Sequence, residues 1–261
     1  MHQGTFSLLA ADDPPSVSVQ NASGASPILL VADHAGVASP RALDRLGVAE
    51  VEWKRHIAWD IGIAGLARML SDALDATLIR QNYSRLVIDC NRPLDAASSI
   101  PEISELTPIP GNIGLSNAEK AARAREIFYP YHECIEAERE RRRQAGRPTA
   151  LIALHSFTPE FKGLAWPWHV ALLSNRDRRL ADQLLDLFRE ERGLVVGDNQ
   201  PYSVSDTTDY TIPVHGERHG LLHALIEIRQ DLIAEDSGQQ QWAARLAHAL
   251  PRAYDSVAAG S

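Results

Sequence analysis

The sequence lacks the features that several classes of protein require. Its two cysteines, Cys90 and Cys134, are too few for a disulfide framework or for a zinc cluster built on thiolates. No apolar run approaches the roughly 20 residues of a membrane-spanning helix. The N-terminal segment has no positively charged start followed by a long apolar stretch, so we expect no secretory signal. These absences predict a cytoplasmic protein with no membrane partner.

Basic character is scarce as well. The net charge of −8 disfavours binding to nucleic acid or to an anionic membrane, because both partners call for a basic patch. The one basic run, residues 139–143, is interleaved with glutamates and is typical of a solvated helix face. We therefore expect a small-molecule partner. Nothing in the sequence predicts an oligomeric state.

The signatures of three common enzyme classes are also missing. Ser156 stands in LHSF and not in the G-x-S-x-G turn of serine hydrolases. There is no G-x-x-x-x-G-K-[ST] phosphate loop, and no G-x-G-x-x-G opens a helix after a strand. Serine-hydrolase, nucleotide-hydrolase and dinucleotide-binding chemistry are therefore disfavoured.

What is present is a regular alternation of short apolar runs with amphipathic segments. This alternation predicts an α/β three-layer sandwich, in which a mixed, mostly parallel sheet has helices on both faces. At 261 residues, with no internal repeat or break in composition, the chain is expected to form a single domain over residues 1–261. We expect strands at 27–33, 77–80, 86–90, 150–154, 169–173, 194–197 and 221–229. The expected helices cover 51–74, 178–191 and 239–254. A further helix should start at a capping box over 116–119 and break at Pro130, with a second helical piece running to Gln144.

Polar residues follow the apolar runs where parallel strands would end. His34 closes ILLVADH, His155 closes ALIALH, and Asn91 and Arg92 open a long loop that reaches about Leu115. In open α/β sheets the carboxyl ends of strands form the binding crevice, so we expect these side chains to converge there. A loop of this length is usually functional or disordered, and the content of this one suggests an ordered rim.

Two imidazoles and a carboxylate predict a metal site. Zinc prefers nitrogen ligands from histidine together with a carboxylate oxygen, and a catalytic site keeps one position for water. We assign His34 and His155 as ligands, although a lone histidine at a strand end is often only a hydrogen-bonded structural residue. The third ligand is open between two carboxylates. Asp60 is the first choice because it follows His56 by four residues in the expected helix, although an acidic residue is also favoured near a helix start. Asp33 is the other candidate, and it could instead orient a ligand histidine.

The run LIEIRQDL predicts the catalytic base. Alternation along this strand places Glu227 and Arg229 on the face opposite Ile226 and Ile228. A buried carboxylate is costly unless it serves a polar site, so we assign Glu227 as the general base, with an internal ion pair to Arg229 as the alternative.

Four further residues, together with Arg229, are expected to contact the substrate. Arg92 presents a planar fork suited to a carboxylate, Asn91 adds directional hydrogen bonds, and Arg85 is a second anion contact. Arg92 could instead order its own loop through backbone carbonyls. His215 is the most plausible substrate contact among three histidines before the last strand, with a surface or structural role as its alternative.

At these residues the sequence resembles the N-formylglutamate amidohydrolase family. The matching segments, in order along nearly the whole chain, are VADHAG (31–36), HIAWDIG (56–62), YSRLVIDCNRP (83–93), PGN (110–112), IALHSFTP (152–159), VGDNQPYS (196–203) and LIEIRQDL (225–232). The family is similar in fold to the zinc carboxypeptidases and the aspartoacylase-type deacylases. The resemblance implies that His155 binds zinc, that Asn91 and Arg92 hold a substrate carboxylate, and that Glu227 is the base. The relatives' H-x-x-E zinc motif is absent, because Val37 stands where it would have glutamate.

These observations lead to a functional expectation. We expect an amidohydrolase with one Zn²⁺ or another divalent ion per chain, which removes a formyl or other small N-acyl group from an acidic amino acid such as N-formyl-L-glutamate. Two alternatives stay open: a metallopeptidase or desuccinylase of the same fold, and a non-catalytic protein that binds a metal or an acid.

Overall fold

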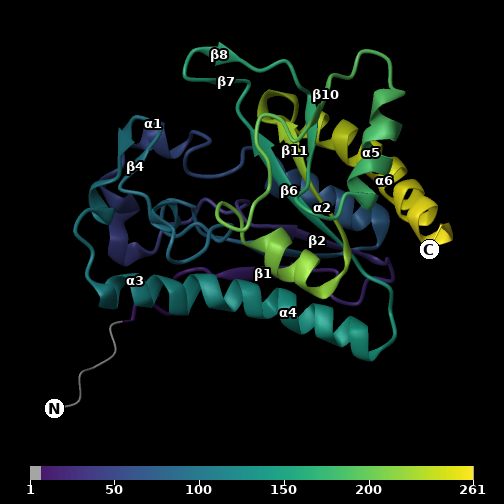
Figure 1. Cartoon of the computed structure of the whole chain (residues 1–261). Helices are drawn as coiled ribbons and strands as arrows, with labels where there is room; N and C mark the ends of the chain where they lie inside the picture. The colour runs from purple at the N-terminus through teal and green to yellow at the C-terminus, as the bar shows by residue number, and fades with distance from the viewer. Residues whose placement is uncertain (1–6, 261) are drawn as a thin grey trace.

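A single seven-stranded sheet organises the computed structural model, which describes residues 7–260 (Figure 1). The terminal residues 1–6 and 261 of the expected domain lie outside the described residues. The strand order is β1-β3-β2-β6-β11-β9-β10. The strands are β1 (Val17–Gln20), β2 (Ile28–Ala32), β3 (Thr77–Gln81), β6 (Ala150–Phe157), β9 (Val170–Leu173), β10 (Val196–Asp198) and β11 (Leu222–Arg229). Only the β1–β3 and β9–β11 pairs are antiparallel, so the predicted mixed, mostly parallel sheet is confirmed.

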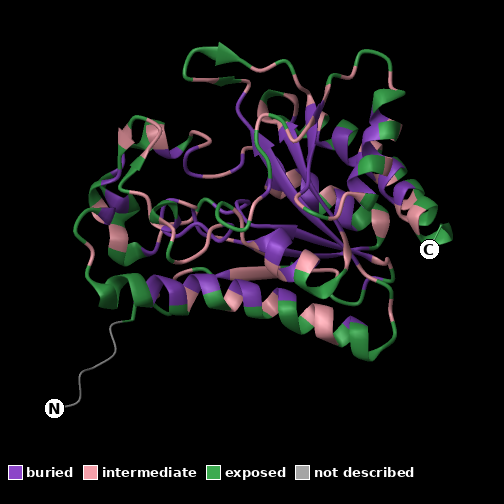
Figure 2. Ribbon diagram, viewed as in Figure 1, coloured by how far each residue is buried: buried purple, intermediate pink, exposed green. Residues whose placement is uncertain are grey.

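Helices cover both faces of this sheet, as the alternation predicted. On one face α2 (Ile63–Leu74) and α5 (Arg179–Arg189) pack with α6 (Asp236–Ala259) against side chains such as Ile226 and Ile228. On the other face lie α3 (Asn117–Arg123), a π-helical turn over Ala124–Phe128, and α4 (Tyr129–Gln144). Figure 2 shows the buried strands between these two layers, whose helices are exposed on part of their surface. No described helix is long and apolar enough to cross a bilayer.

The central strands are buried because their alternate side chains enter two different cores. Along β11, Ala224, Ile226 and Ile228 belong to the core beneath α6, whereas Leu225 belongs to the core beneath α4. Glu227 therefore follows Leu225 on the α4 side of the sheet, as the alternation predicted. The predicted separation of Glu227 from the isoleucines is confirmed.

The helix predicted over 51–74 is confirmed over Ile63–Leu74 but is wrong as one continuous helix, because the chain breaks in its middle. A short helix α1 (Glu50–Trp53) is followed by turns, and α2 begins only at Ile63. Gly62 adopts a φ of +83°, and a Cβ atom there would lie 2.1 Å from the backbone oxygen of Ile233. Only glycine combines this left-handed backbone with so close a contact, so Gly62 ends any continuous helix.

The predicted strand over 86–90 is also wrong. β3 already has β1 and β2 as neighbours, so the sheet offers this segment no free strand edge beside β3. Side chains bond its backbone instead: Asn112 donates to the oxygen of Leu86 (2.9 Å), and Arg123 donates to the oxygen of Val87 (2.8 Å). The segment contains turns and no strand, and its backbone bonds partly to side chains and partly to the backbone of neighbouring loops, as Asp89 does to Ser99.

The long loop after residue 91 is an ordered rim, as its composition predicted. It contains a small hairpin of β4 (Ile103–Ser104) and β5 (Thr107–Pro108), with 3-10 turns at Ala97–Ser99 and Pro110–Asn112. The predicted capping box is confirmed: the Ser116 side chain accepts from the backbone of Glu119, whose carboxylate accepts from the backbone of Ser116. A second hairpin, β7 (Glu160–Phe161) with β8 (Leu164–Ala165), follows β6 and projects beyond its carboxyl end (Figure 1).

Candidate metal centre and active site

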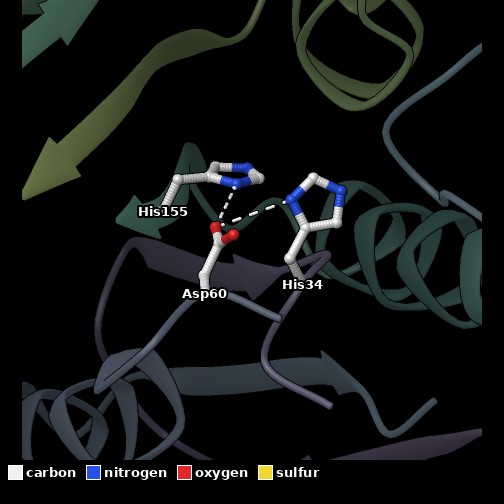
Figure 3. A group of neighbouring side chains, drawn as sticks. All are labelled: His34, Asp60 and His155. Atoms are coloured by element: carbon white, nitrogen blue, oxygen red, sulfur yellow. Dashed lines mark hydrogen bonds and ion pairs between the residues drawn. The ribbon is translucent and has the colours of Figure 1, made fainter. Parts of the chain in front are cut away.

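His34, Asp60 and His155 converge at the carboxyl ends of β2 and β6 (Figure 3). One ligand atom from each lies within 4.8 Å of the others. Ligands of one ion with bonds of about 2 Å lie up to about 4 Å apart, so the group is nearly of the right size for a single divalent cation. Each side chain is only 2–3% exposed. The geometry brings together the three residues that the sequence predicted as metal ligands.

The same nitrogen of each imidazole faces Asp60. Nδ1 of His155 lies 2.9 Å from Oδ2 of Asp60, and Nδ1 of His34 lies 3.5 Å from the same oxygen. The Nδ1 atom of His34 is buried and has no hydrogen-bond partner among the described residues. An unpartnered buried nitrogen is costly, and a metal ion is a natural partner for it. This donor set fits zinc or a similar divalent ion.

The Nε2 atom of each imidazole contacts a further carboxylate, a different one for each ring. Nε2 of His34 lies 2.7 Å from Oδ1 of Asp89, and Nε2 of His155 lies 3.0 Å from Oδ2 of Asp33. A carboxylate in this position fixes which nitrogen of a histidine is free to bind a metal. The prediction that Asp33 could orient a ligand histidine agrees with this contact. The contribution of Asp89 was missed.

The buried charges at the centre do not balance. Asp33, Asp60 and Asp89 carry three negative charges against the one positive charge of Arg85, which lies 2.8 Å from Asp89 and 3.4 Å from Asp60. Burial opposes the charged form of His155, yet hydrogen bonds with Asp33 and Asp60 raise its pKa well above the usual value. Burial likewise opposes ionisation of Asp33, but the hydrogen bond and charge of His155 lower its pKa to about 2. A proton on His155 offsets part of this negative charge, and a divalent cation would offset more of it.

Asp60 owes its position to the break that ends the predicted helix. Its backbone N–H donates to the oxygen of His34 (2.9 Å), which ties the turn before α2 to the end of β2. The expected helical spacing from His56 is therefore not the reason that Asp60 reaches the site. His56 itself lies 2.9 Å from Glu105. Asp60 was therefore predicted correctly as a neighbour of the two histidines, but through a helix that does not form there.

Glu227 lies beside this group without a partner of its own. It is paired in register with His155 across the β11–β6 ladder. Its Oε2 atom is buried and has no hydrogen-bond partner in the described part of the chain. Burial raises the pKa of Glu227 to about 7, despite the opposing influence of His155. The alternative ion pair with Arg229 does not form, because Arg229 bonds Asp231 (2.7 Å).

A cavity of about 340 Å³ opens above these side chains. It is lined by His34, Asp60, His155 and Glu227, by the predicted substrate contacts Arg85, Asn91 and Arg92, and by residues of the loop before β11 such as Tyr202 and Asp209. Ligand sites of this kind are concave and carry a few converging polar groups.

Comparisons with known proteins identify the family of the chain. A sequence model of the N-formylglutamate amidohydrolase family matches residues 26–234. The chain belongs to this family. A gene product of Agrobacterium tumefaciens of known crystal structure is 36% identical, with a TM-score of 0.92 over 96% of this chain and 99% of that one. The N-formylglutamate amidohydrolase of Ralstonia eutropha is 19% identical, with a TM-score of 0.64 over 92% and 99% of the two chains, and this likeness concerns the fold. No curated protein sequence matches the chain.

In this member of the amidohydrolase family, Arg92 and Asn91 both line the cavity. The Asn91 amide is largely committed to the loop before β11: Nδ2 donates to Asp209 (3.1 Å), and Oδ1 accepts from the backbone of Tyr210 and Thr211 (3.0 Å each). Asn91 therefore positions that loop against the site, which sequence patterns do not reveal.

Arg92 and Arg85 differ in how far their charges are compensated. Arg92 donates to the backbone oxygens of Asn91 and Thr208, and its nearest carboxylate oxygen, on Asp209, is 4.0 Å away. Arg85 donates two hydrogen bonds, from Nε and Nη2, to Oδ2 of Asp89. Of the two arginines, Arg92 is thus the freer to receive a substrate carboxylate.

Two predicted substrate contacts do not reach the cavity. Arg229 turns toward Asp231 and the backbone oxygen of Trp168 at the end of β11. His215 lies in a π-helical turn, where its Nε2 is 2.9 Å from Nδ1 of His132. Burial lowers the pKa of His215 to about 4, so it is a neutral member of a buried histidine pair. We correct both predictions and leave these residues out of the site.

Proposed function

We propose that this family member is a metal-dependent amidohydrolase that removes a formyl or other small acyl group from the nitrogen of an acidic amino acid. The observation that carries the proposal is the buried group of His34, Asp60 and His155 beside the unpartnered carboxylate of Glu227. N-formyl-L-glutamate is the first substrate to test. Its formyl amide agrees with the family, and its carboxylates agree with the arginine in the cavity.

His34, Asp60 and His155 would hold the ion through Nδ1, Oδ2 and Nδ1. Such an ion polarises a carbonyl oxygen and lowers the pKa of water from 15.7 to about 7, so that hydrolysis can run near neutrality. The absence of an H-x-x-E motif is accommodated, because Asp60 supplies the carboxylate oxygen that the motif would otherwise provide.

Glu227 moves the proton in this proposal. Glu227 lines the cavity, and its Oε2 has no hydrogen-bond partner among the described residues. In this position the carboxylate can take a proton from the attacking water and return it to the leaving nitrogen. Arg92 orients the substrate by binding a carboxylate of the amino acid, which is the part that leaves as the amine. The hydrogen bond between Asn91 and Asp209 holds the loop that carries Arg92 against the loop before β11.

Elemental analysis combined with a hydrolysis panel tests the proposal. We expect one divalent ion per chain, and formate release from N-formyl-L-glutamate that a chelator abolishes and added zinc restores. The panel includes N-acetyl-, N-succinyl- and N-formylamino acids and short peptides. Preference for succinyl compounds or peptides would replace the proposed activity with one of the two other hydrolase functions. A metal-loaded protein that hydrolyses none of them would be a binding protein.

A further inference from the structure

A second cavity adjoins the one that contains the metal ligands. It has a volume of about 380 Å³ and shares four lining side chains with the first cavity: His56, Arg85, Arg92 and Tyr202. The two cavities therefore meet along one wall. The rest of the second cavity's lining comes from Phe161 and Lys162 of the β7–β8 hairpin, from parts of the segment 98–105, and from Ile57, Leu86 and Asp89. The two carboxylates of this lining already have cationic partners: Asp89 pairs with Arg85, and Glu105 pairs with Arg55 and His56.

Lys162 is the uncompensated cation of this second cavity. Arg85 is paired with Asp89, His56 lies 2.9 Å from Glu105, and Arg92 belongs to the wall of the first cavity. Within residues 7–260, no carboxylate lies within ion-pair distance of the Lys162 ammonium. Its Nζ lies over the ring of Phe161, 5.3 Å from the ring centre.

Aromatic packing ties the hairpin that carries Lys162 to the shared wall. Phe161 stacks on Trp166 with ring centres 5.4 Å apart, and Trp166 meets Tyr202 edge-on at 5.4 Å. Lys162 and Gly163 both have positive φ, at 52° and 79°, as the two central residues of a tight hairpin turn. Lys162 is exposed, but its backbone lies at the tip of a short hairpin that aromatic rings pack against the shared wall.

This arrangement matches what a dicarboxylic substrate requires. An N-acylated acidic amino acid has one carboxylate on its α-carbon and a second at the end of its side chain. Arg92 stands at the wall between the cavities and can receive the first carboxylate. The second carboxylate then needs a cation beyond that wall, and Lys162 is the one without an anionic partner.

Building on the proposed function, we propose that the second cavity is the side-chain subsite and that Lys162 binds the distal carboxylate of the substrate. The enzyme thereby selects acidic over neutral amino acids of the same length. Lys162 is a specificity-determining residue and takes no part in the bond-breaking step.

Paired substrates test this assignment. N-formyl-L-glutamate and N-formyl-L-glutamine have nearly the same shape and differ in the charge of the distal group. We expect Lys162→Gln to lower kcat/KM for the glutamate compound about fivefold, the effect of losing one partly exposed ion pair, and to leave the glutamine compound within about twofold. Lys162→Arg should retain the selectivity, and the selectivity of the unmodified enzyme should decline as salt is raised. Lys120→Gln, an exposed lysine of α3, is the matched control.

A binding measurement separates this proposal from the proposed function. Dissociation constants for both compounds are measured by calorimetry on the metal-loaded protein in a Glu227→Gln background, with and without Lys162→Gln. If binding is charge-selective and depends on Lys162, but the unmodified protein does not hydrolyse formyl amides, the subsite is upheld and the proposed activity is overturned. Hydrolysis with equal losses for both compounds, or with no loss for either, would overturn the subsite alone. Absence of charge-selective binding and of hydrolysis would overturn both.

Discussion

Oδ2 of Asp33 lies 3.0 Å from Nε2 of His155, on the side of the ring opposite Asp60. Asp33 is itself held by the hydroxyl of Thr211 (2.7 Å), which donates to its other oxygen. A carboxylate fixed in this way sets the orientation of the imidazole and the nitrogen that it offers to an ion. The proposed metal centre would therefore depend on side chains that need not touch the metal.

Replacement of Asp33 or Asp89 should weaken metal binding without removing a ligand. We expect Asp33→Asn and Asp89→Asn each to lower zinc affinity about 10- to 100-fold, the usual effect of losing a carboxylate that supports a ligand histidine. Competition with a chromophoric chelator measures the change. Asp255→Asn, at an exposed position of α6, is the control. Unaltered affinity in both variants would contradict the supporting role.

Replacement of Glu227 should separate metal binding from turnover. Glu227→Gln keeps the size of the side chain but cannot accept a proton, so we expect turnover to fall by at least about a hundredfold. The metal content should stay at one ion per chain, since Glu227 is outside the ligand group. Steady-state kinetics with elemental analysis provide both values, with Glu133→Gln on the exposed side of α4 as the control. Normal turnover in the variant would remove Glu227 from the mechanism.

Metal binding should release a proton and weaken as pH falls. Burial disfavours the charged imidazole of His155, but Asp33 and Asp60 raise its pKa well above the usual value, so the metal-free ring holds a proton at neutral pH. An ion must displace that proton, and acidification favours the protonated ring. Affinity is therefore expected to rise with pH until the metal-free ring loses its proton.

Calorimetric titration in buffers of different ionisation enthalpy counts the protons released. We expect about one proton for each zinc ion bound near pH 7. Binding enthalpies that do not depend on the buffer would contradict a protonated His155 in the metal-free protein.

A buried arginine supports the segment that carries Arg92, the proposed substrate anchor. Arg123 is 1% exposed, and it donates to Oδ1 of Asn112 (2.6 Å) and to the backbone oxygens of Val87 and Gly111. Arg123→Met would leave these acceptors buried without donors, so we expect the free energy of unfolding to fall by about 3 kcal/mol.

Urea denaturation measures this loss of stability, with Lys120→Met on the exposed face of the same helix as the control. Equal stability of the two variants would show that the segment holds its shape without the guanidinium.

The layered fold was largely predictable because each buried strand or helix has its own pattern of apolar residues in the sequence. β2, β6 and β11 are nearly continuous apolar runs, and their polar ends identified His34, His155 and Glu227. Strand alternation also placed Glu227 on the correct face, because the period of two is a local property of the backbone.

The rest of the site depends on contacts between distant segments. Asp89 lies in what the sequence presents as an apolar strand, and no local pattern indicates that it will meet His34, 55 residues earlier. Arg229 was predicted from its nearness to Glu227 along β11, but the strand ends there and the side chain turns to Asp231. Asp60 was predicted through a helix that Gly62 does not allow.

The depth of the ligand group has a kinetic consequence. With His34, Asp60 and His155 only 2–3% exposed, a chelator larger than the cavity mouth cannot grip an ion while the surrounding segments keep their places. Departure of the ion would then await local opening of the turn before α2 or the loop before β11, so its rate would level off as more chelator is added.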